Sequence, residues 1–177
     1  ERLIAVACDV SNEASVRSAL AALATGHGAL NGLVNNAGIH LAAPSHALSV
    51  DTYQQVMQVN ATSVFVACRE AYPHLVAAGG GTIVNIGSFF DKMGVKNNVA
   101  YCASKAAVGA ITRCLAVEWA PKNIRVMDVA PGYIATDLNR DAMTRGPLAE
   151  YLKKRMQDLL GYGLAMEGLA LMEQLDK

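Results

Sequence analysis

The sequence predicts an α/β fold built on a doubly wound parallel sheet in three layers, and three observations support that prediction. Short, nearly continuous apolar runs alternate with longer amphipathic runs along the chain. Apolar strands joined by crossover helices are typical of parallel sheets that are covered on both faces. Polar or glycine-containing motifs follow the apolar runs, as expected where ligands bind at the carboxyl ends of parallel strands.

The predicted elements follow one another in the order β-α-β-α-β-α-β. The first apolar run predicts a buried strand, and Ser11 or Asn12 would cap the helix after it. Asp51 suits the first turn of the second helix, and the glycines at 79–81 end it. The expected strands are Leu3–Val10, Leu30–Gly38, Thr82–Ser88 and Asn123–Gly132, and the expected helices are Ser11–Ala24, Ser49–Ala78 and Val99–Ala120.

Length and composition predict a single domain over residues 1–177. Residues 1–139 would form the sheet core and catalytic part, and residues 140–177 a helical substrate lid and tail. The chain has 177 residues, of which 53% are hydrophobic, enough to bury one core. Fifteen basic residues balance fifteen acidic ones without a large basic cluster, so neither nucleic acid nor a membrane is expected as a partner. The expected partner is a small molecule.

The cysteines and the apolar runs bear on location and on metal binding. Cys8, Cys68, Cys102 and Cys114 stand singly, without the spacing of metal sites or of secreted disulfide frameworks. No apolar run approaches the roughly 20 residues of a membrane span, and the charged start is unlike a signal peptide. We therefore expect a cytoplasmic protein with reduced thiols and no metal.

Tyr101 and Lys105 open the third predicted helix and project from one face of it, because they are four residues apart. An arbitrary pair with this spacing is more often an exposed tyrosine beside a solvated lysine. Chemistry would require Lys105 to stabilise the tyrosinate, since a phenol with a pKa of about 10 is a poor base at neutral pH. Such a tyrosine could exchange a proton with an alcohol or carbonyl oxygen.

Two further polar residues could join this pair. Ser88 ends a predicted strand, where its hydroxyl could hold the same oxygen, although a loop serine taken alone more often makes a turn hydrogen bond. Asn60 interrupts an otherwise apolar helical segment, either as a satisfied core amide at a kink or as a functional group.

Together these residues form a set of motifs that resembles the short-chain dehydrogenase/reductase family. The motifs are NNAG at Asn35–Gly38, Asn60, IVNIGS ending at Ser88, YCASK at Tyr101–Lys105 and PGYIAT at Pro131–Thr136. Their order and approximate spacing match the family over roughly Leu3–Asn139. The resemblance implies a Rossmann-like fold and an NAD- or NADP-dependent oxidoreductase that transfers a hydride between the nicotinamide and a secondary alcohol or ketone.

The resemblance also implies a role for each matching residue. Tyr101 would be the general acid/base, Lys105 would lower its pKa and bind the nicotinamide ribose, and Ser88 would polarise the substrate oxygen. Asn60 would complete a proton relay through a water molecule near Lys105. The remaining cofactor contacts would be Asp9 and Val10 at the adenine, Asn36, Ala37 and Gly38 at the adenosine ribose, and Pro131, Gly132, Ile134 and Thr136 at the nicotinamide.

The chain departs from the family pattern at both ends. The strand and glycine-rich turn that receive the pyrophosphate are absent before Glu1, and the late run Gly161–Gly168 lacks the required glycine spacing. The residue that separates NAD from NADP is missing, and so is the closing strand. Two interpretations remain open: an enzyme whose complete chain supplies the turn, or a truncated member that acts as a non-catalytic scaffold. Retention of all four catalytic candidates favours the enzyme.

Substrate specificity is expected mainly after Thr136. The polar residues Asn139, Arg140 and Arg145 could meet hydroxyls or a carboxylate, and Phe89–Asn97 would line the opposite wall. A polyol or sugar acid is favoured slightly over a 3-oxoacyl thioester, although solvated lid charges would explain the arginines equally well. The four histidines, His27, His40, His46 and His74, lack ligand spacing and receive no role.

The two long helices predict a homodimer or homotetramer, which the resemblance also implies. Their small and apolar positions exceed what one sheet face needs if the opposite face of each helix meets water. These positions are Ala61, Val64, Ala67 and Cys68 on one helix and Ala103, Ala107, Ala110, Cys114 and Val117 on the other. Ordinary packing within one chain is the alternative.

Overall fold

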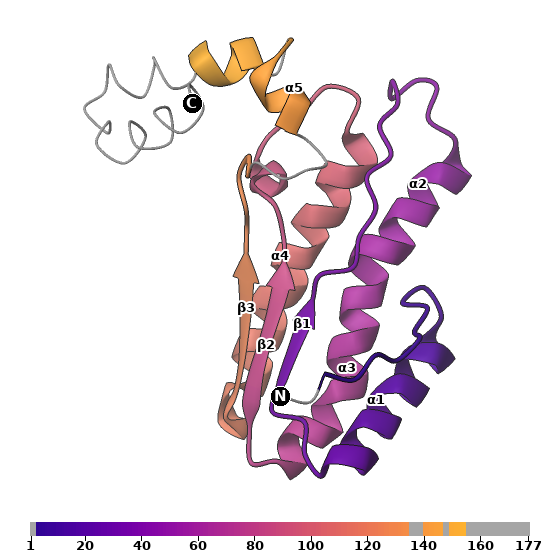
Figure 1. The fold of residues 1–177 in the computed structure, drawn as a ribbon, viewed down its shortest axis with the longest axis vertical. Coiled ribbons are helices and arrows are strands. Elements are labelled where there is room, and N and C mark those ends of the chain that lie inside the picture. Colours follow the sequence, from indigo (N-terminus) through magenta and orange to yellow (C-terminus); the bar gives the residue numbers. More distant parts are fainter. Residues whose placement is uncertain (1–2, 135–139, 147–148, 155–177) are drawn as a thin grey trace, which may run out of the picture. The chain divides into compact units, whose positions relative to one another are not determined.

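The computed structural model describes residues 3–134, 140–146 and 149–154, which belong to two compact units, residues 1–132 and 133–177. The first unit contains a three-stranded parallel sheet with helices packed on it, so the expected Rossmann-like α/β fold is confirmed (Figure 1). The second unit contains the short helix α5 (Arg140–Thr144) and an edge-to-face contact between Tyr133 and Tyr151. That both units form one domain stays a prediction.

The sheet consists of β1 (Gly32–Asn35), β2 (Gly81–Ile86) and β3 (Ile124–Val129), in that order. Both strand pairs are parallel, with Asn35 opposite Asn85 and Ile86 opposite Val129. Three of the four expected strands are therefore confirmed, each shorter than its apolar run. The residues that follow these runs lie at the carboxyl ends of the strands.

The helices begin and end close to the expected positions. Helix α1 (Glu13–His27) is capped by the Asn12 side chain, which accepts a hydrogen bond from the Ser15 backbone N–H. The expected helix at Ser49–Ala78 consists of α2 (Val50–Met57), a π-helical segment (Gln58–Thr62) and α3 (Ser63–Ala77). Helix α4 (Val99–Trp119) carries Tyr101 and Lys105, and 3₁₀ turns occupy Phe89–Lys92 and Ala120–Lys122.

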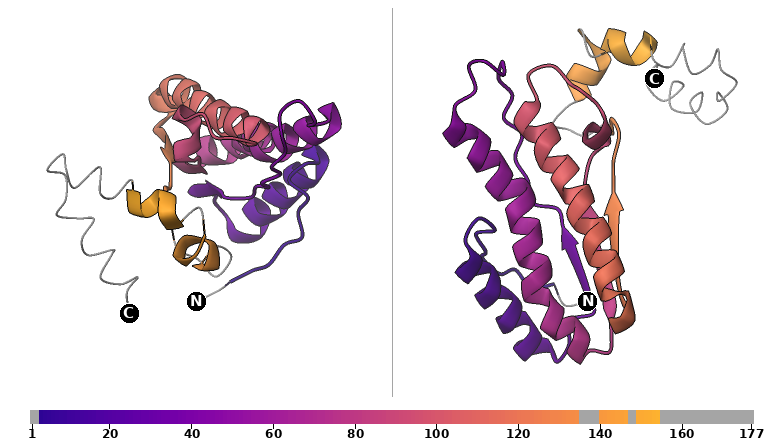
Figure 2. Two further views of the ribbon diagram at one scale, coloured as in Figure 1. Left: turned by 90° about the horizontal axis from the view of Figure 1, so that it is seen from above. Right: turned by 180° about the vertical axis from the view of Figure 1, so that it is seen from behind.

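Helices α3 and α4 lie on the same face of the sheet, as Figure 2 shows from behind. The reason is the strand order: β1 to β2 and β2 to β3 step in one direction, and right-handed crossovers then place both connecting helices on one side. On the opposite face the side chains of Val34, Met127 and Val129 are exposed. Among residues 3–132 the helices thus form one of the two helical layers that were expected, one on each face of the sheet.

The strand expected at Leu3–Val10 is wrong. Residues 3–9 have no regular secondary structure, and Leu3 is 99% exposed. A cavity of about 210 Å³ is lined on one side by Val6, Cys8 and Val10 and on the other by β1 and the residues after it. The described strands pair only with one another, β1 with β2 and β2 with β3, so this apolar run has no ladder partner.

The core fills the space between the sheet and helices α3 and α4, and its members include Leu75, Ile83, Val108 and Ile124. Ala61, Val64 and Cys68, which the sequence offered for an interface, are buried inside this chain, so that expectation was wrong for these three residues. On α4, Ala110, Cys114 and Val117 are exposed and so remain available for an interface. The oligomer itself stays a prediction.

Candidate active site

Ser88, Tyr101 and Lys105 come together at the carboxyl end of β2. Ser88 follows this strand and opens the 3₁₀ turn, where its Oγ accepts a hydrogen bond from the Phe90 N–H at 3.2 Å. Lys105 Nζ donates to the Ile86 carbonyl oxygen at 2.7 Å, two residues before Ser88. The same Nζ lies 5.6 Å from the centroid of the Tyr101 ring. The three residues that the sequence grouped are therefore neighbours.

Asn60 lies in the π-helical segment between α2 and α3 and is 1% exposed. Its Oδ1 accepts from the Ile39 N–H at 2.8 Å, and its Nδ2 donates to the Ile39 carbonyl at 2.9 Å and to Ser104 Oγ at 3.1 Å. The amide thus ties the loop after β1 to α4 beside Lys105. Segments of π-helix often occur at functional sites. A satisfied core amide at a kink describes this side chain, and its place in a proton relay stays a prediction.

Burial dominates the electrostatics of this cluster. It raises the pKa of Tyr101, and the hydrogen bond with Ser88 acts in the opposite direction. It lowers the pKa of Lys105, which is 7% exposed, while the charge of Asp128 opposes that effect. In this structure the Lys105 ammonium group is directed to the Ile86 carbonyl, and Lys105 is not among the groups that shift the pKa of Tyr101, so the expectation that it lowers that pKa stays a prediction.

Two aromatic rings hold the Tyr101 ring on edge. His40 lies 4.8 Å away between ring centroids at an interplanar angle of 69°, and Phe90 lies 5.8 Å away at 89°. The His40 ring also contacts the Asn98 side chain at the start of α4. The sequence alone assigned no role to His40. Its position two residues after the NNAG motif, beyond the end of a parallel strand, was the signal that could have marked it.

The residues expected at the cofactor are placed as follows. Asn36, Ala37 and Gly38 follow β1 and are exposed, and Pro131 and Gly132 follow β3, where the Pro131 carbonyl accepts from the Phe89 N–H at 3.3 Å. Asp9 accepts from the Ser11 N–H and hydroxyl in the turn before α1, and Val10 lines the 210 Å³ cavity. Ile134 belongs to the second unit, and Thr136 lies outside the described residues.

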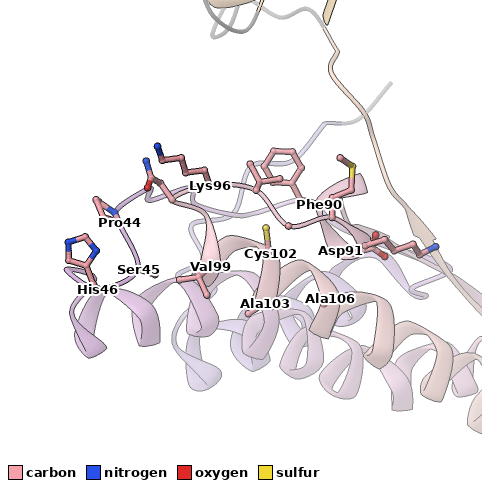
Figure 3. Close-up of a pocket in the computed structure, with 15 residues that line it drawn as sticks. Pro44, Ser45, His46, Phe90, Asp91, Lys96, Val99, Cys102, Ala103 and Ala106 are labelled. Atoms are coloured by element: carbon pink, nitrogen blue, oxygen red, sulfur yellow. The ribbon is translucent and has the colours of Figure 1, made fainter. Parts of the chain in front are cut away.

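An open groove of about 860 Å³ runs beside the start of α4. Its lining includes Phe90–Asn97, the segment that the sequence assigned to a substrate wall, together with His46, and Figure 3 shows Cys102 directed into it from α4. Ser88, Tyr101 and Lys105 do not line this groove, so a role in substrate binding stays a prediction.

In the part of the chain that the structure describes, no group of three or more His, Cys, Asp or Glu side chains could hold a metal ion. No described helix is long and apolar enough to cross a membrane. The four cysteines are unpaired.

A parallel α/β sheet with a tyrosine, a lysine and a serine clustered at its carboxyl edge defines a Rossmann-like protein with a candidate proton-transfer site. The chain belongs to the short chain dehydrogenase family, whose profile matches residues 1–145.

The alignments with individual relatives cover most of this chain but only part of each relative's length. The D-threitol dehydrogenase of Mycolicibacterium smegmatis is 36% identical over 148 residues, which are 84% of this chain and 56% of that enzyme. The 3-oxoacyl-acyl-carrier-protein reductase FabG of Chlamydia pneumoniae is 36% identical over 82% of this chain and 58% of its own.

Among solved structures, a gluconate 5-dehydrogenase from Burkholderia cenocepacia in complex with NADP and tartrate is similar with a TM-score of 0.78. It is 35% identical, and the match covers 83% of this chain and 58% of that one. This chain therefore spans little more than half the length of these three proteins.

Proposed function

We propose that the complete protein is an NAD- or NADP-dependent oxidoreductase that interconverts a secondary alcohol and a ketone. The observation that carries the proposal is the cluster of Ser88, Tyr101 and Lys105 at the carboxyl edge of the sheet. Membership of the short chain dehydrogenase family supports it.

The described residues fit the reactive half of a dinucleotide. Asn36, Ala37 and Gly38 are exposed after β1 and would contact a ribose, and Lys105 and Pro131–Gly132 lie at the ends of the next two strands. Dinucleotides bind outside the carboxyl ends of strands in such sheets. When bound, NAD or NADP would accept or supply the hydride. Contacts to the pyrophosphate are proposed to come from outside the described residues.

The proton would be handled at Tyr101 Oη. A phenol is protonated at neutral pH and burial raises the pKa of Tyr101 further, so Tyr101 would act as the acid that protonates a ketone oxygen. In the reverse direction its tyrosinate would be the base. Ser88, in hydrogen-bond contact with Tyr101, would hold the same oxygen. Lys105 would bind the ribose and stabilise the tyrosinate left after transfer. Asn60, bonded to Ser104 beside Lys105, would connect this pair to a water molecule.

The proposed substrate is a small polyol or sugar acid. Similarity to a D-threitol dehydrogenase and to a gluconate 5-dehydrogenase supports this class. Similarity to a 3-oxoacyl-acyl-carrier-protein reductase supports a second candidate, a 3-oxoacyl-thioester reductase. The exposed residues Ala110, Cys114 and Val117 on α4 support a homodimer or homotetramer, and the isolated cysteines support a cytoplasmic location.

Replacement of Tyr101 by Phe tests the proposal. The wild-type protein should bind NADH or NADPH, seen by nicotinamide fluorescence, and oxidise or reduce members of a polyol, sugar-acid and 3-oxoacyl-thioester panel. Tyr101→Phe should keep the binding and lose at least about 100-fold in kcat, because the proton donor is removed. Tyr53→Phe, the same change on α2, should leave kcat unchanged. Absence of binding of either cofactor by the wild-type protein would support the scaffold.

A further inference from the structure

Strand β3 carries a carboxylate on its core-facing side. Side chains alternate along a strand, and Ile124 and Val126 are buried toward α4, so Asp128 points the same way. A charged residue on this face of an apolar strand is costly unless it has partners. Asp128 Oδ1 is buried and has no hydrogen-bond partner.

Glycine at position 87 makes room for this carboxylate. A Cβ added to Gly87 would overlap Asp128 Oδ1 and lie 2.8 Å from Oδ2. Gly87 stands between Ile86, whose carbonyl accepts from Lys105, and Ser88. The carboxylate of Asp128 therefore lies directly beside the backbone that carries two of the candidate catalytic contacts.

Helix α4 approaches the same carboxylate at Gly109, which shares one face with Lys105 and Arg113 at four-residue spacing. A Cβ on Gly109 would lie 3.6 Å from Asp128 Oδ2, 3.6 Å from Asp91 Oδ2 and 3.3 Å from Arg113 Nη1. Arg113 from α4 and Asp91 from the 3₁₀ turn thus lie around Asp128. Lys105 is the third charged group that acts on it, from its hydrogen bond to the Ile86 carbonyl one residue before Gly87.

These charges act on one another. Burial lowers the pKa of Lys105, and Asp128 is the charge that opposes it. In return, burial raises the pKa of Asp128, as does the charge of Asp91, while the nearby Gly87 backbone N–H and the charges of Lys105 and Arg113 lower it. The coupling joins a group of the candidate site to one that the proposed reaction does not use.

We propose that Asp128 is a positioning residue whose carboxylate keeps the Lys105 side chain protonated and directed toward the Ile86 carbonyl, next to Tyr101. Asp128 acts through Lys105 and touches neither substrate nor cofactor. The catalytic meaning of this coupling rests on the proposed function, whereas the coupling itself can be measured without turnover.

The first test is the titration of Lys105 in the wild-type protein and in Asp128→Asn. Each is treated with a small excess of acetic anhydride at a series of pH values, and acetylation of Lys105 is measured by peptide mass spectrometry relative to the exposed Lys122. The midpoint of the rate against pH reports the protonation equilibrium, and the alkaline plateau reports access. In Asp128→Asn the midpoint should move to lower pH, with a rate rise of about tenfold below the midpoint for each pKa unit.

Asp91→Asn is the matched control, because it removes a carboxylate that faces the same glycine but is not among the charges acting on Lys105. It should leave the midpoint in place. Asp128→Ala repeats the test should Asp128→Asn fail to give the wild-type circular dichroism. An unchanged midpoint in the folded Asp128 variant, or an equal shift in Asp91→Asn, overturns the proposal.

A second readout uses turnover of the complete protein. If protonated Lys105 is required, loss of kcat on the alkaline side should begin at lower pH in Asp128→Asn than in the wild type. A uniform drop in kcat with an unchanged pH profile would indicate a merely structural role and would contradict the proposal. Failure of the proposed function is recognised separately, since Tyr101→Phe would then leave activity unchanged.

Discussion

Residues 3–8 and strand β3 are short apolar runs of the same length, but only β3 forms a strand. Ile124–Val129 pairs along its whole length with β2 and buries Ile124 and Val126 under α4. The run LIAVAC at Leu3–Cys8 makes no ladder and is exposed throughout. Leu3–Cys8 is the more apolar of the two runs, because β3 contains Arg125 and Asp128.

Hydrogen-bonding neighbours, rather than apolar content, therefore decide which of these two runs becomes a strand. β3 pairs with β2 and packs against α4, and it forms a strand although it carries the Asp128 carboxylate. The N-terminal run lines a cavity together with β1 but pairs with none of the described strands. Equal substitutions at packed positions and at exposed or open positions should therefore have unequal effects on stability.

The largest difference is expected for leucine. Leu75→Ala should lower the free energy of unfolding by about 2–5 kcal/mol, because Leu75 is fully buried and the substitution leaves a cavity in the core. Leu3→Ala, the same change at an exposed site, should stay within about 0.5 kcal/mol of the wild type. Urea unfolding followed by circular dichroism measures both, and similar losses at the two positions would show that the N-terminal run is packed in solution.

A smaller difference is expected for glycine. A Cβ at Gly81 would lie 2.6 Å from the Asn31 carbonyl oxygen and 2.7 Å from Leu75 Cδ2, so Gly81→Ala should cost about 1–3 kcal/mol through overpacking. A Cβ at Gly32, on the edge strand β1, would meet only the Thr82 carbonyl oxygen at 3.6 Å. Gly32→Ala should be close to neutral in the same urea assay. A neutral Gly81→Ala would mean that the start of β2 is looser than its contacts indicate.

Much of the fold could be predicted from the sequence because it depends on local periodicity. The helices at α1 and α4 and the strands β1 to β3 follow from apolar spacing, caps and glycines. The failure at Leu3–Val10 has a physical cause, since periodicity describes a segment and says nothing about whether a neighbour exists at pairing distance. The π-helical segment at Asn60 was anticipated only as a kink.

The candidate site was predictable where a motif carries it. Ser88, Tyr101 and Lys105 were found by their spacing and lie together, whereas His40 and Asp128 were missed because they come from other strands' ends and approach through tertiary packing. The sequence shows that Lys105 is near Tyr101. The structure adds that both side chains are partly buried, which raises the pKa of Tyr101 and lowers the pKa of Lys105.

The cysteines give the smallest expected difference between a packed and an exposed position. Cys68 lies in the core, with its Sγ accepting from Asn35 Nδ2 at 3.3 Å, and burial raises its pKa to about 12. Cys8 is exposed on the N-terminal run. Because the thiolate is the reactive form, Cys8 should react with a disulfide reagent at pH 8 in the native protein, and Cys68 only after unfolding in urea.

The same pKa has a consequence for stability. The thiol of Cys68 stays protonated in the folded chain, while the unfolded chain loses this proton near its ordinary value of 9.0. The stability that Cys68 contributes is therefore complete below pH 9 and declines as the pH rises toward 12, by up to about 1.4 kcal/mol per pH unit. Urea unfolding at pH 7.5 and pH 10 should show the wild type losing more stability than Cys68→Ala, whereas Cys8→Ala should follow the wild type. Equal pH dependence in all three proteins would show that the thiol of Cys68 ionises as freely in the folded core as in the unfolded chain.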